Sequence, residues 1–316
     1  MKNGAMNRNG SNGAKSKPRS VARIEMPIEE SRLPVLKTYK IYIGGKFPRT
    51  ESGRFYQVKN PKTGAPLANV CLSSRKDFRE AVVAATDAQA GWANRSAYNR
   101  AQILYRIAEM LEGRSAQFID EMMKQGYTDR DAKIEIATAV DRLVYYAGWA
   151  DKYQQIFSSV NPVASSHFNF SVLEPTGIVA VFAPPESALV GLISTIIPAI
   201  TGGNAVIALA ANKYPLTAVT LAEVLATSDL PGGVINILTG NPAELAEHFA
   251  SHMGVHAVIW SGGDAKDLLT IRTKSALNVK RAVIYDRGDW LADAAQSPYY
   301  ILDTQEVKTT WHPIGV

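Results

Sequence analysis

Hydrophobic residues recur along this chain with two different spacings. Between residues 172 and 263, short runs rich in Val, Ile and Ala alternate with longer segments whose apolar residues recur every three or four positions. The short runs predict buried strands and the longer segments predict helices, because each spacing follows the period of its element. This alternation is typical of βαβ units, in which crossover helices connect the strands of a parallel sheet.

The central alternation predicts a definite order of elements. Pro215 suits the first turn of a helix, because the N–H that proline lacks would have no partner there. The predicted fold class is therefore α/β, a parallel sheet with flanking helices. Strands are expected at 177–182, 205–209, 234–238, 256–260 and 280–285, and helices at 187–200, 215–226 and 243–251.

The flanking regions contain shorter stretches of both patterns. Ser74 and Asp77 resemble a capping box, which predicts that a helix begins there. Residues 167–172 and 304–313 alternate apolar and polar positions and predict extended segments. The pattern is irregular after Asp289. We further expect a strand with a tight turn at 37–46, strands at 55–59 and 68–72, and helices at 96–112, 115–124 and 129–155.

The composition limits the classes of partner. Of the 316 residues, 46% are hydrophobic, which is ample for a core. The net charge of +5 is concentrated in residues 1–23, which hold six basic residues and no acidic one, leaving 28 basic and 29 acidic side chains elsewhere. The remainder is nearly neutral, so we expect no nucleic-acid partner. The longest apolar runs are too short to span a bilayer, so we also expect no membrane association.

Residues 1–31 and the single cysteine bear on location. The first 31 residues are poor in large apolar groups and predict a disordered basic arm without a secretory signal. An organelle presequence or an RNA-binding tail stays an alternative for this arm. Cys71 has no partner for an intramolecular disulfide, which favours a reducing, cytoplasmic location.

Short motifs recur in a fixed order along the chain. They are Tyr42–Lys46, Asn60–Gly64, Glu174–Gly177, Gly202–Asn204, Pro215–Ala218, Leu230–Asn236, Ser251–Met253 and Glu306–Thr309. Together, in this register, they resemble the aldehyde dehydrogenase superfamily. The resemblance runs almost continuously from Tyr39 to Gly288, resumes at Glu306, and implies a Rossmann-like NAD-binding domain with a small oligomerisation β-sheet. Because a C-terminal motif of the family is present, an internal loss is favoured over a simple truncation.

The resemblance implies a catalytic cysteine in a separate domain beyond the Rossmann-like strands. No cysteine lies there, and only a short segment separates Gly288 from the C-terminal motif. Cys71 falls in an N-terminal strand, where a small buried hydrophobic role is expected. A thiolate nucleophile would instead need electropositive surroundings and a pocket.

Two other catalytic positions implied by the resemblance are changed. An amide that holds the oxyanion aligns with Glu186, whose carboxylate would repel a developing alkoxide. Losing one such donor typically costs about 100- to 1000-fold in rate. A new general-base role for Glu186 is an alternative, but an acid at a helix N-terminus is the simpler interpretation. The glutamate that activates water aligns with Tyr285, and a phenol is a poor base at neutral pH.

The cofactor positions are changed as well. The lysine and glutamate that the resemblance implies for the adenosine ribose align with Leu209 and Asn212, and leucine offers no hydrogen bond. Gly262 and Gly263 would allow close approach of a pyrophosphate, although Asp264 would oppose its charge. We expect no bound cofactor, while weak binding of NAD or NADP at this turn stays open.

Three histidines at intervals of four, His248, His252 and His256, are candidate metal ligands. His248 and His252 could share one helix face, but Gly254 interrupts the helix before His256. No third ligand has convincing spacing, so no metal site is predicted.

Together these substitutions predict a catalytically inactive aldehyde dehydrogenase-like protein, a structural or regulatory subunit that pairs with itself or with a full-length aldehyde dehydrogenase. The alternative is an NAD(P)-dependent aldehyde oxidoreductase whose activity is residual or completed in trans by a partner subunit. A free-standing nucleotide-binding module is a third possibility. The expected organisation is a disordered arm (1–31), N-terminal strands and helices (32–156), oligomerisation strands (157–173), a Rossmann-like core (174–289), a linker replacing the catalytic domain (290–303) and a C-terminal oligomerisation strand (304–316).

Overall fold

A computed structural model describes residues 35–285 and 288–315, so the predicted basic arm lies outside the described residues. The helices are α1 (Arg75–Ala93), α2 (Ala97–Gly113), α3 (Ser115–Lys124), α4 (Asp129–Trp149), α5 (Tyr153–Phe157), α6 (Val190–Thr201), α7 (Pro215–Leu225), α8 (Pro242–Ser251), α9 (Ala265–Ala276) and α10 (Tyr299–Leu302), with a 3₁₀ turn at Asp293–Ala295. The strands are β1 (Thr38–Tyr39), β2 (Phe55–Lys59), β3 (Pro66–Cys71), β4 (Ser159–Asn161), β5 (His167–Pro175), β6 (Ile178–Phe182), β7 (Ala205–Leu209), β8 (Ile235–Leu238), β9 (Ala257–Trp260), β10 (Arg281–Ile284) and β11 (Gln305–Pro313).

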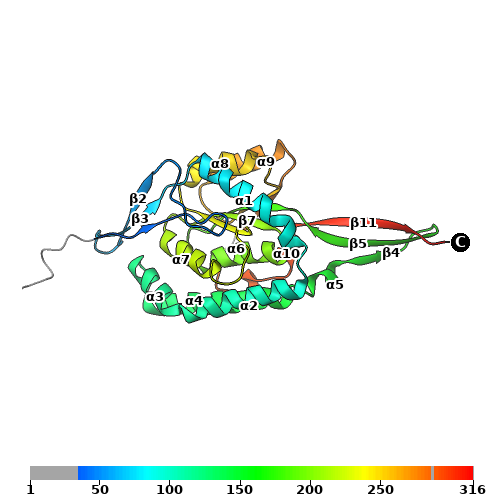
Figure 1. The fold of residues 1–316 in the computed structure, drawn as a ribbon, viewed down its shortest axis with the longest axis horizontal. Coiled ribbons are helices and arrows are strands. Elements are labelled where there is room, and N and C mark those ends of the chain that lie inside the picture. Colours follow the sequence, from blue (N-terminus) through cyan, green and yellow to red (C-terminus); the bar gives the residue numbers. More distant parts are fainter. Residues whose placement is uncertain (1–34, 286–287, 316) are drawn as a thin grey trace, which may run out of the picture. The chain divides into compact units, whose positions relative to one another are not determined.

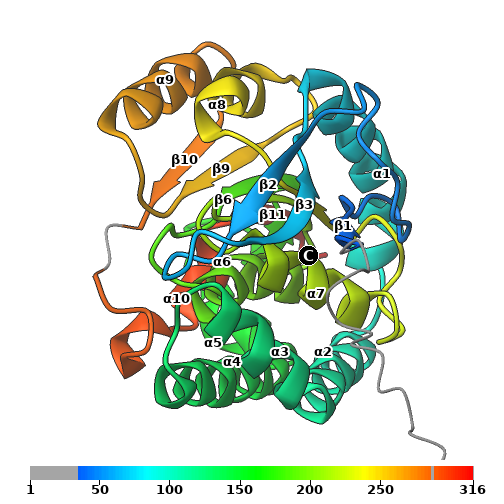
Figure 2. The same cartoon turned by 90° about the vertical axis from the view of Figure 1, so that its left-hand side faces the viewer.

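The predicted parallel sheet is confirmed. Its five strands follow the order β10-β9-β6-β7-β8, and every neighbouring pair is parallel. The earliest of these five strands in the sequence, β6, lies at the centre, so the chain first moves outward through β7 and β8 and then to the other side through β9 and β10. Figure 2 shows β6, β9 and β10 in this order. In such a sheet the carboxyl ends of neighbouring strands diverge at this reversal and leave a crevice.

Helices cover both faces of this sheet because its strands are apolar on both faces. Along β6, Val179 and Val181 belong to the hydrophobic cluster beneath α6 and α7, whereas Ile178, Ala180 and Phe182 belong to the cluster beneath α1 and α8. Helix α6 is buried at all 12 positions, because α4 packs on its outer side. The long helices α2 and α4 thus form a further layer (Figure 1).

The N-terminal strands form a small sheet of their own, in the order β1-β3-β2. The capping box that begins α1 is confirmed, since the Ser74 side chain accepts from the Lys76 N–H and the Asp77 carboxylate accepts from the Ser74 N–H. Such a cap contributes roughly 1 kcal/mol. It fixes the point at which the chain leaves β3 for the helical layers.

A third sheet contains β11, β5 and β4, in that order and antiparallel. In Figure 1 these strands lie at the end of the molecule opposite β2 and β3. Central strand β5 pairs with β11 over nine residue pairs, from Gln305 with Pro175 to Pro313 with His167. The two predicted extended segments, far apart in the sequence, are therefore neighbours.

Several predicted boundaries were wrong. The helix expected at 187–200 begins at Val190. The helix expected at 129–155 ends at Trp149, and the chain then forms the short helix α5, in which Tyr153 is buried. The strand expected at 37–46 is only β1, followed by an isolated bridge from Tyr42 to Ile237 and a turn. The segment after Asp289, expected to be irregular, contains the 3₁₀ turn and α10. Among the described residues, no helix is both long and apolar enough to cross a membrane.

Candidate functional site

Two cavities lie where the turn after β6 meets the carboxyl edge of the central sheet. The first has a volume of about 420 Å³ and the second about 370 Å³. Glu186 lines the first and Pro185 the second, so this turn separates them. The first is also lined by Tyr127, Asp131, Glu135, Ser187, Tyr214 and Trp290, and the second by Phe182, Leu209, Asn212, Lys213, Trp260, Gly262, Gly263, Asp264 and Asp267.

At the predicted oxyanion position, the Glu186 carboxylate is already engaged. Its Oε1 atom accepts a hydrogen bond of 2.7 Å from the indole Nε1 of Trp290, which belongs to the connection between β10 and β11. The other oxygen, Oε2, lies 3.9 Å from where a Cβ atom would stand on Gly262. A carboxylate accepts hydrogen bonds and donates none when ionised, so this side chain cannot serve as an oxyanion donor.

The acid at the start of α6 is Glu135 rather than Glu186. Its Oε1 atom accepts from the backbone N–H groups of Leu189 and Val190 at 2.7 and 3.1 Å, and from the Ser187 hydroxyl at 2.7 Å. These N–H groups begin the helix and would otherwise have no partner. A carboxylate from α4 thus stabilises the delayed start of α6, and the expectation that Glu186 would do so was wrong.

The connection between β10 and β11 is held by a buried arginine on α4. The guanidinium of Arg142 donates to the Ser194 hydroxyl at 2.6 Å, to the Ala295 carbonyl at 2.7 Å and to the Trp290 carbonyl at 3.3 Å. Burial lowers the pKa of Arg142, which is 1% exposed. One turn further along α4, Tyr146 donates to the Ser297 carbonyl. The connection is therefore packed into the body along much of its length.

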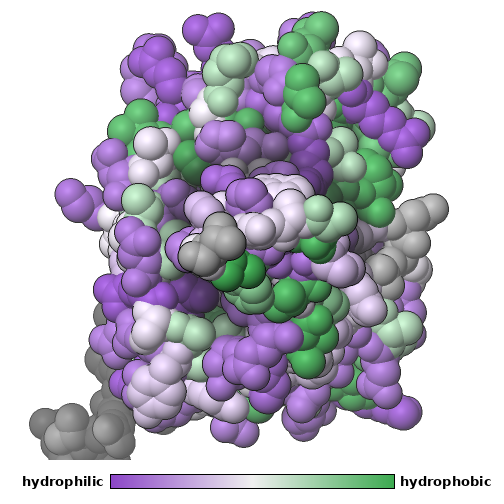
Figure 3. Space-filling view, turned by 90° about the vertical axis from the view of Figure 1, so that its right-hand side faces the viewer, coloured by the Kyte–Doolittle hydropathy of each residue, from purple (hydrophilic) through white to green (hydrophobic). Residues whose placement is uncertain are grey.

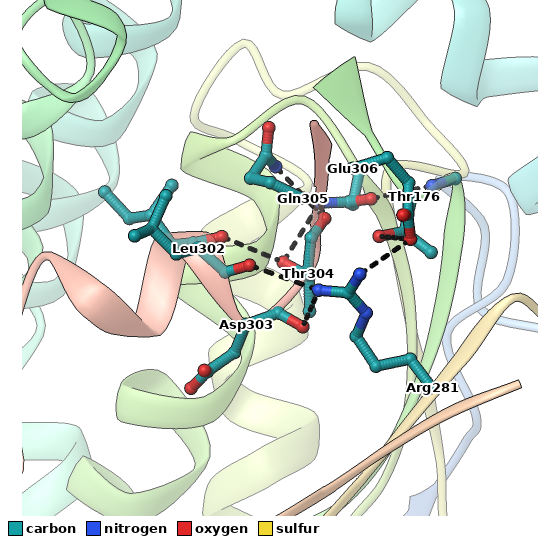
Figure 4. A network of polar contacts seen from close by, with 10 residues as sticks. Thr176, Arg281, Leu302, Asp303, Thr304, Gln305 and Glu306 are labelled. Carbon is teal, nitrogen blue, oxygen red and sulfur yellow. Dashed lines mark hydrogen bonds and ion pairs between the residues drawn. The ribbon is translucent and has the colours of Figure 1, made fainter. Parts of the chain in front are cut away.

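A second set of contacts fixes the point where this connection enters β11 (Figure 4). Arg281, the first residue of β10, donates to the carbonyls of Leu302 and Asp303 and forms a 2.9 Å ion pair with Glu306. Thr176 also donates to Glu306. These contacts join the last strand of the central sheet to the first residues of β11, with only residues 285–304 between the two strands.

Tyr285, at the position predicted for a general base, follows β10 and is 6% exposed. Its hydroxyl donates to Asp303 Oδ2 at 2.8 Å. Burial, followed by the Asp303 charge, raises the pKa of Tyr285 well above its usual value. The phenol therefore stays protonated at neutral pH, in an environment suited to donating a hydrogen bond and unsuited to abstracting a proton from water.

The second cavity contains the predicted cofactor positions. Leu209 is buried at the end of β7, and Asn212 lies in the loop beyond it. Gly262 and Gly263 both have positive φ angles, 113° and 129°, which favour glycine. The following helix α9 is capped by its own Asp264, whose Oδ1 accepts from the Lys266 N–H at 2.8 Å.

The charges around this turn do not suit a pyrophosphate. Asp264 caps α9, and Asp267 lies in its first turn. Burial raises the pKa of Asp267, and the neighbouring Asp264 charge raises it further. Lys213 is the only cation among the residues that line this cavity. A helix N-terminus that would otherwise attract phosphate is thus occupied by two carboxyl groups.

Two of the three histidines at intervals of four accept backbone hydrogen bonds within the fold. His256 Nδ1 accepts from the Ile178 backbone N–H at 3.0 Å, and His252 Nδ1 accepts from the Gly254 N–H at 3.1 Å. The described residues contain no group of three or more His, Cys, Asp or Glu side chains arranged to hold a metal. Cys71 is buried in β3, away from both cavities.

The contacts of Trp290, Arg142 and Glu135 could not be found from spacing. Each joins segments at least 50 residues apart in the sequence, and neither Arg142 nor Glu135 breaks the helical pattern of α4. The one available signal in the sequence was a charged residue, Glu135 or Arg142, on the apolar face of a predicted helix. Both side chains occupy positions where the periodicity of the helix predicts an inward face.

Comparison with known proteins identifies the fold and the family. Residues 47–284 match the aldehyde dehydrogenase family. An NAD⁺ complex of an aldehyde dehydrogenase from Bacillus cereus superposes with a TM-score of 0.74 at 25% identity, covering 78% of this chain and 50% of that one. HpcC from Thermus thermophilus has a TM-score of 0.74 at 26% identity, with 78% and 48% covered. An NADP-dependent enzyme of E. coli shares the fold, with a TM-score of 0.74 at 22% identity and 78% and 51% covered.

The extent of these matches is unequal on the two sides. The matched region takes up more than three quarters of this chain but only about half the length of each of those structures. The family match, residues 47–284, includes all five strands of the central sheet and the helices between them.

Proposed function

The chain belongs to the aldehyde dehydrogenase family, and on that basis we propose that it is a catalytically inactive member acting as a structural or regulatory subunit. The observation that carries this proposal is the hydrogen bond between Trp290 and Glu186. Trp290 lies in the connection between β10 and β11, which we propose replaces a catalytic domain. Its buried indole contacts Glu186, at the position where the family resemblance implies an oxyanion donor. An ionised carboxylate at this position accepts hydrogen bonds and cannot donate one to an alkoxide.

The remaining chemistry supports the same proposal. Cys71 is buried in β3 rather than at the carboxyl edge of the sheet. Tyr285 has a raised pKa, and its hydroxyl donates a hydrogen bond to Asp303. Neither group can replace the thiolate and the carboxylate that aldehyde oxidation by a covalent route needs. Packing of the β10–β11 connection by Arg142 further favours a stable, closed arrangement over an open active site.

We also propose that NAD and NADP bind weakly or not at all. Leu209 cannot bond to a ribose hydroxyl, and the carboxyl groups of Asp264 and Asp267 oppose a pyrophosphate. The single cysteine favours a reducing, cytoplasmic location for this protein.

The free edge of β11 supports assembly. Thr176 N donates to Thr304 O and Ile314 N donates to Ser166 O, so even-numbered residues of β11 bond to β5. Because the pattern alternates, the N–H and C=O groups of Val307, Thr309 and Trp311 point away from β5. No other strand among the described residues lies along this edge. An open edge of this length favours pairing with another strand.

The edge is complementary to itself. An antiparallel pair of β11 strands centred on Thr309 would set Val307 opposite Trp311 and Glu306 opposite His312. Val307 and Trp311 are 67% and 57% exposed, so this pair would bury apolar surface. A register centred one residue earlier would set Lys308 against itself. Figure 3, which faces this end of the molecule, shows hydrophobic surface interspersed with hydrophilic surface. A second copy of the chain is therefore the partner we propose, and a full-length aldehyde dehydrogenase is the alternative.

The proposal is tested by assaying the purified protein with a panel of aldehydes and either NAD or NADP. No reduced cofactor should appear above a protein-free control. Sustained turnover that survives Cys71→Ala would overturn the proposal, because it would require a nucleophile or mechanism that this site does not provide. Turnover that appears only when a full-length aldehyde dehydrogenase is added would favour completion in trans instead.

A further inference from the structure

A small cleft with a positively charged lining lies between α1 and α8. It has a volume of about 230 Å³ and is lined by Arg75, Phe78 and Arg79 of α1 and by His248, Ser251 and His252 of α8. Phe78 stacks on Phe249 at 4.3 Å and meets the His252 ring edge-on at 5.7 Å, which fixes the floor of the cleft. The cleft adjoins the C-terminal end of α8, whereas the N-terminal end of that helix lines the second cavity.

None of the residues that line this cleft is acidic, and three nearby carboxylates have partners elsewhere. Glu244 pairs with Arg54 at 3.0 Å, and Glu247 pairs with Lys274 at 2.8 Å. Asp77 accepts from the backbone of Ser74 and Glu51. Neither Arg75 nor Arg79 forms an ion pair within the described part of the chain. The lining therefore concentrates positive charge without a counter-ion.

The cations of the cleft disfavour one another. Burial lowers the pKa of His248, and the charge of Arg75 lowers it further, against a smaller opposing effect of Glu247. Burial also lowers the pKa of His252, with further contributions from Lys280 and Arg79. The ammonium of Lys280 donates to the backbone carbonyl of His252. An anion in the cleft would relieve this repulsion, whereas a metal cation would add to it.

The donors of the cleft suit an oxyanion. Arg75 and Arg79 are four residues apart, so both guanidinium groups extend from one face of α1. Since His252 Nδ1 accepts the Gly254 N–H, the neutral ring carries its proton on Nε2 and can donate there. Ser251 adds a hydroxyl.

We propose that this cleft binds a phosphate group, either as inorganic phosphate or as the phosphate of a small phosphomonoester. Guanidinium groups bind phosphate oxygens through paired hydrogen bonds, and the imidazoles and hydroxyl complete a donor set that contains no acceptor of comparable strength. The site is separate from the carboxyl edge of the central sheet. It does not depend on whether the protein is catalytically active.

The test is an NMR pH titration of the histidine rings in the full chain, with inorganic phosphate and with chloride at matched ionic strength. The chain has only five histidines, so each can be followed. Phosphate should raise the pKa values of His248 and His252 relative to chloride, and the ring signals of His167 and His312, which lie outside the cleft, serve as the reference. Equal shifts at all five histidines, or none at His248 and His252, would overturn the proposal.

Two variants and a second ligand make the test specific. Arg79→Gln should weaken phosphate binding about tenfold, since it removes a charged hydrogen bond. In chloride it should raise the pKa of His252, because a repelling neighbour is lost. Arg272→Gln on α9, an exposed arginine outside the cleft, is the matched control and should change neither. Equal weakening by both variants would contradict the proposal. Tighter binding of phenyl phosphate than of phosphate would indicate a phosphomonoester, and equal or weaker binding would indicate inorganic phosphate.

Discussion

Trp290 donates its indole N–H to the Glu186 carboxylate across a distance of 2.7 Å, and this contact joins the connection after β10 to the turn after β6. Trp290 is 3% exposed, so its ring is a buried part of the core, whereas Glu186 is exposed. The contact therefore holds the connection between β10 and β11 against the turn after β6, and both residues line the first cavity. The family resemblance implies an oxyanion-binding amide at this position. Glu186 has a structural role there instead, because its carboxylate accepts the Trp290 N–H.

Breaking this contact should destabilise the protein. Trp290→Phe retains an aromatic ring but removes the donor, and we expect it to lower the free energy of unfolding by about 1–2 kcal/mol. Urea denaturation of Trp290→Phe, Glu186→Ala and the double variant measures the coupling between the two side chains. The two single effects should sum to more than the double effect by about 1 kcal/mol. Strict additivity would show that the hydrogen bond contributes nothing.

Arg142 should matter more than any exposed arginine. Arg142→Met removes the donors to Ser194, Ala295 and Trp290 while keeping a long side chain, so buried carbonyls lose their partners. We expect a loss of about 3 kcal/mol in the free energy of unfolding. Faster proteolytic cleavage within residues 289–297 should accompany it. Arg130→Met, an exposed position on the same helix, is the control and should change stability by less than about 0.5 kcal/mol.

Lys280 should give the protein a pH dependence at alkaline pH. Burial lowers the pKa of Lys280 to about 8, below the value of 10.5 expected in the unfolded chain. Between these two values the unfolded state binds more protons than the folded state, so stability should rise as the pH increases through this window. Lys280→Met should abolish this rise, as measured by urea denaturation at several pH values. An unchanged rise in the variant would assign the effect to another group.

Local pattern was a reliable guide where an element depends on its own residues. Strand β7 was predicted with both ends correct, since Ala205–Leu209 is buried at every position and follows Asn204 in a tight turn. The start of α6 was misplaced because its first N–H groups are satisfied by Glu135, more than 50 residues earlier. The hydrogen bonds of Trp290 and Arg142 also join segments that are far apart in the sequence. Contacts of this kind leave no periodic trace, so the closure of the first cavity could be recognised only in three dimensions.

Cofactor affinity should respond to the acids at the start of α9. Asp264→Asn retains the cap, because an asparagine oxygen also accepts from the Lys266 N–H, but it removes a negative charge. Combined with Asp267→Asn, it should tighten NAD binding, as measured by calorimetry, by about two- to fivefold per charge. Asp229→Asn, which lies outside the second cavity, should have no effect. Saturable NAD binding by the unmodified protein with a Kd below about 1 mM would contradict the altered cofactor site.

The edge of β11 can be tested with one matched pair of substitutions. Thr309 directs its N–H away from β5, so Thr309→Pro removes a donor from the open edge without removing a β5 hydrogen bond. Thr309→Ala keeps that donor, and both variants lose the same 2.8 Å contact between the hydroxyls of Thr309 and Ser171. Sedimentation velocity should show that the unmodified chain and Thr309→Ala form dimers while Thr309→Pro is monomeric. Dimers that persist in Thr309→Pro would exclude β11 pairing, and a monomer in all three would exclude self-assembly and leave a full-length aldehyde dehydrogenase as the partner to test.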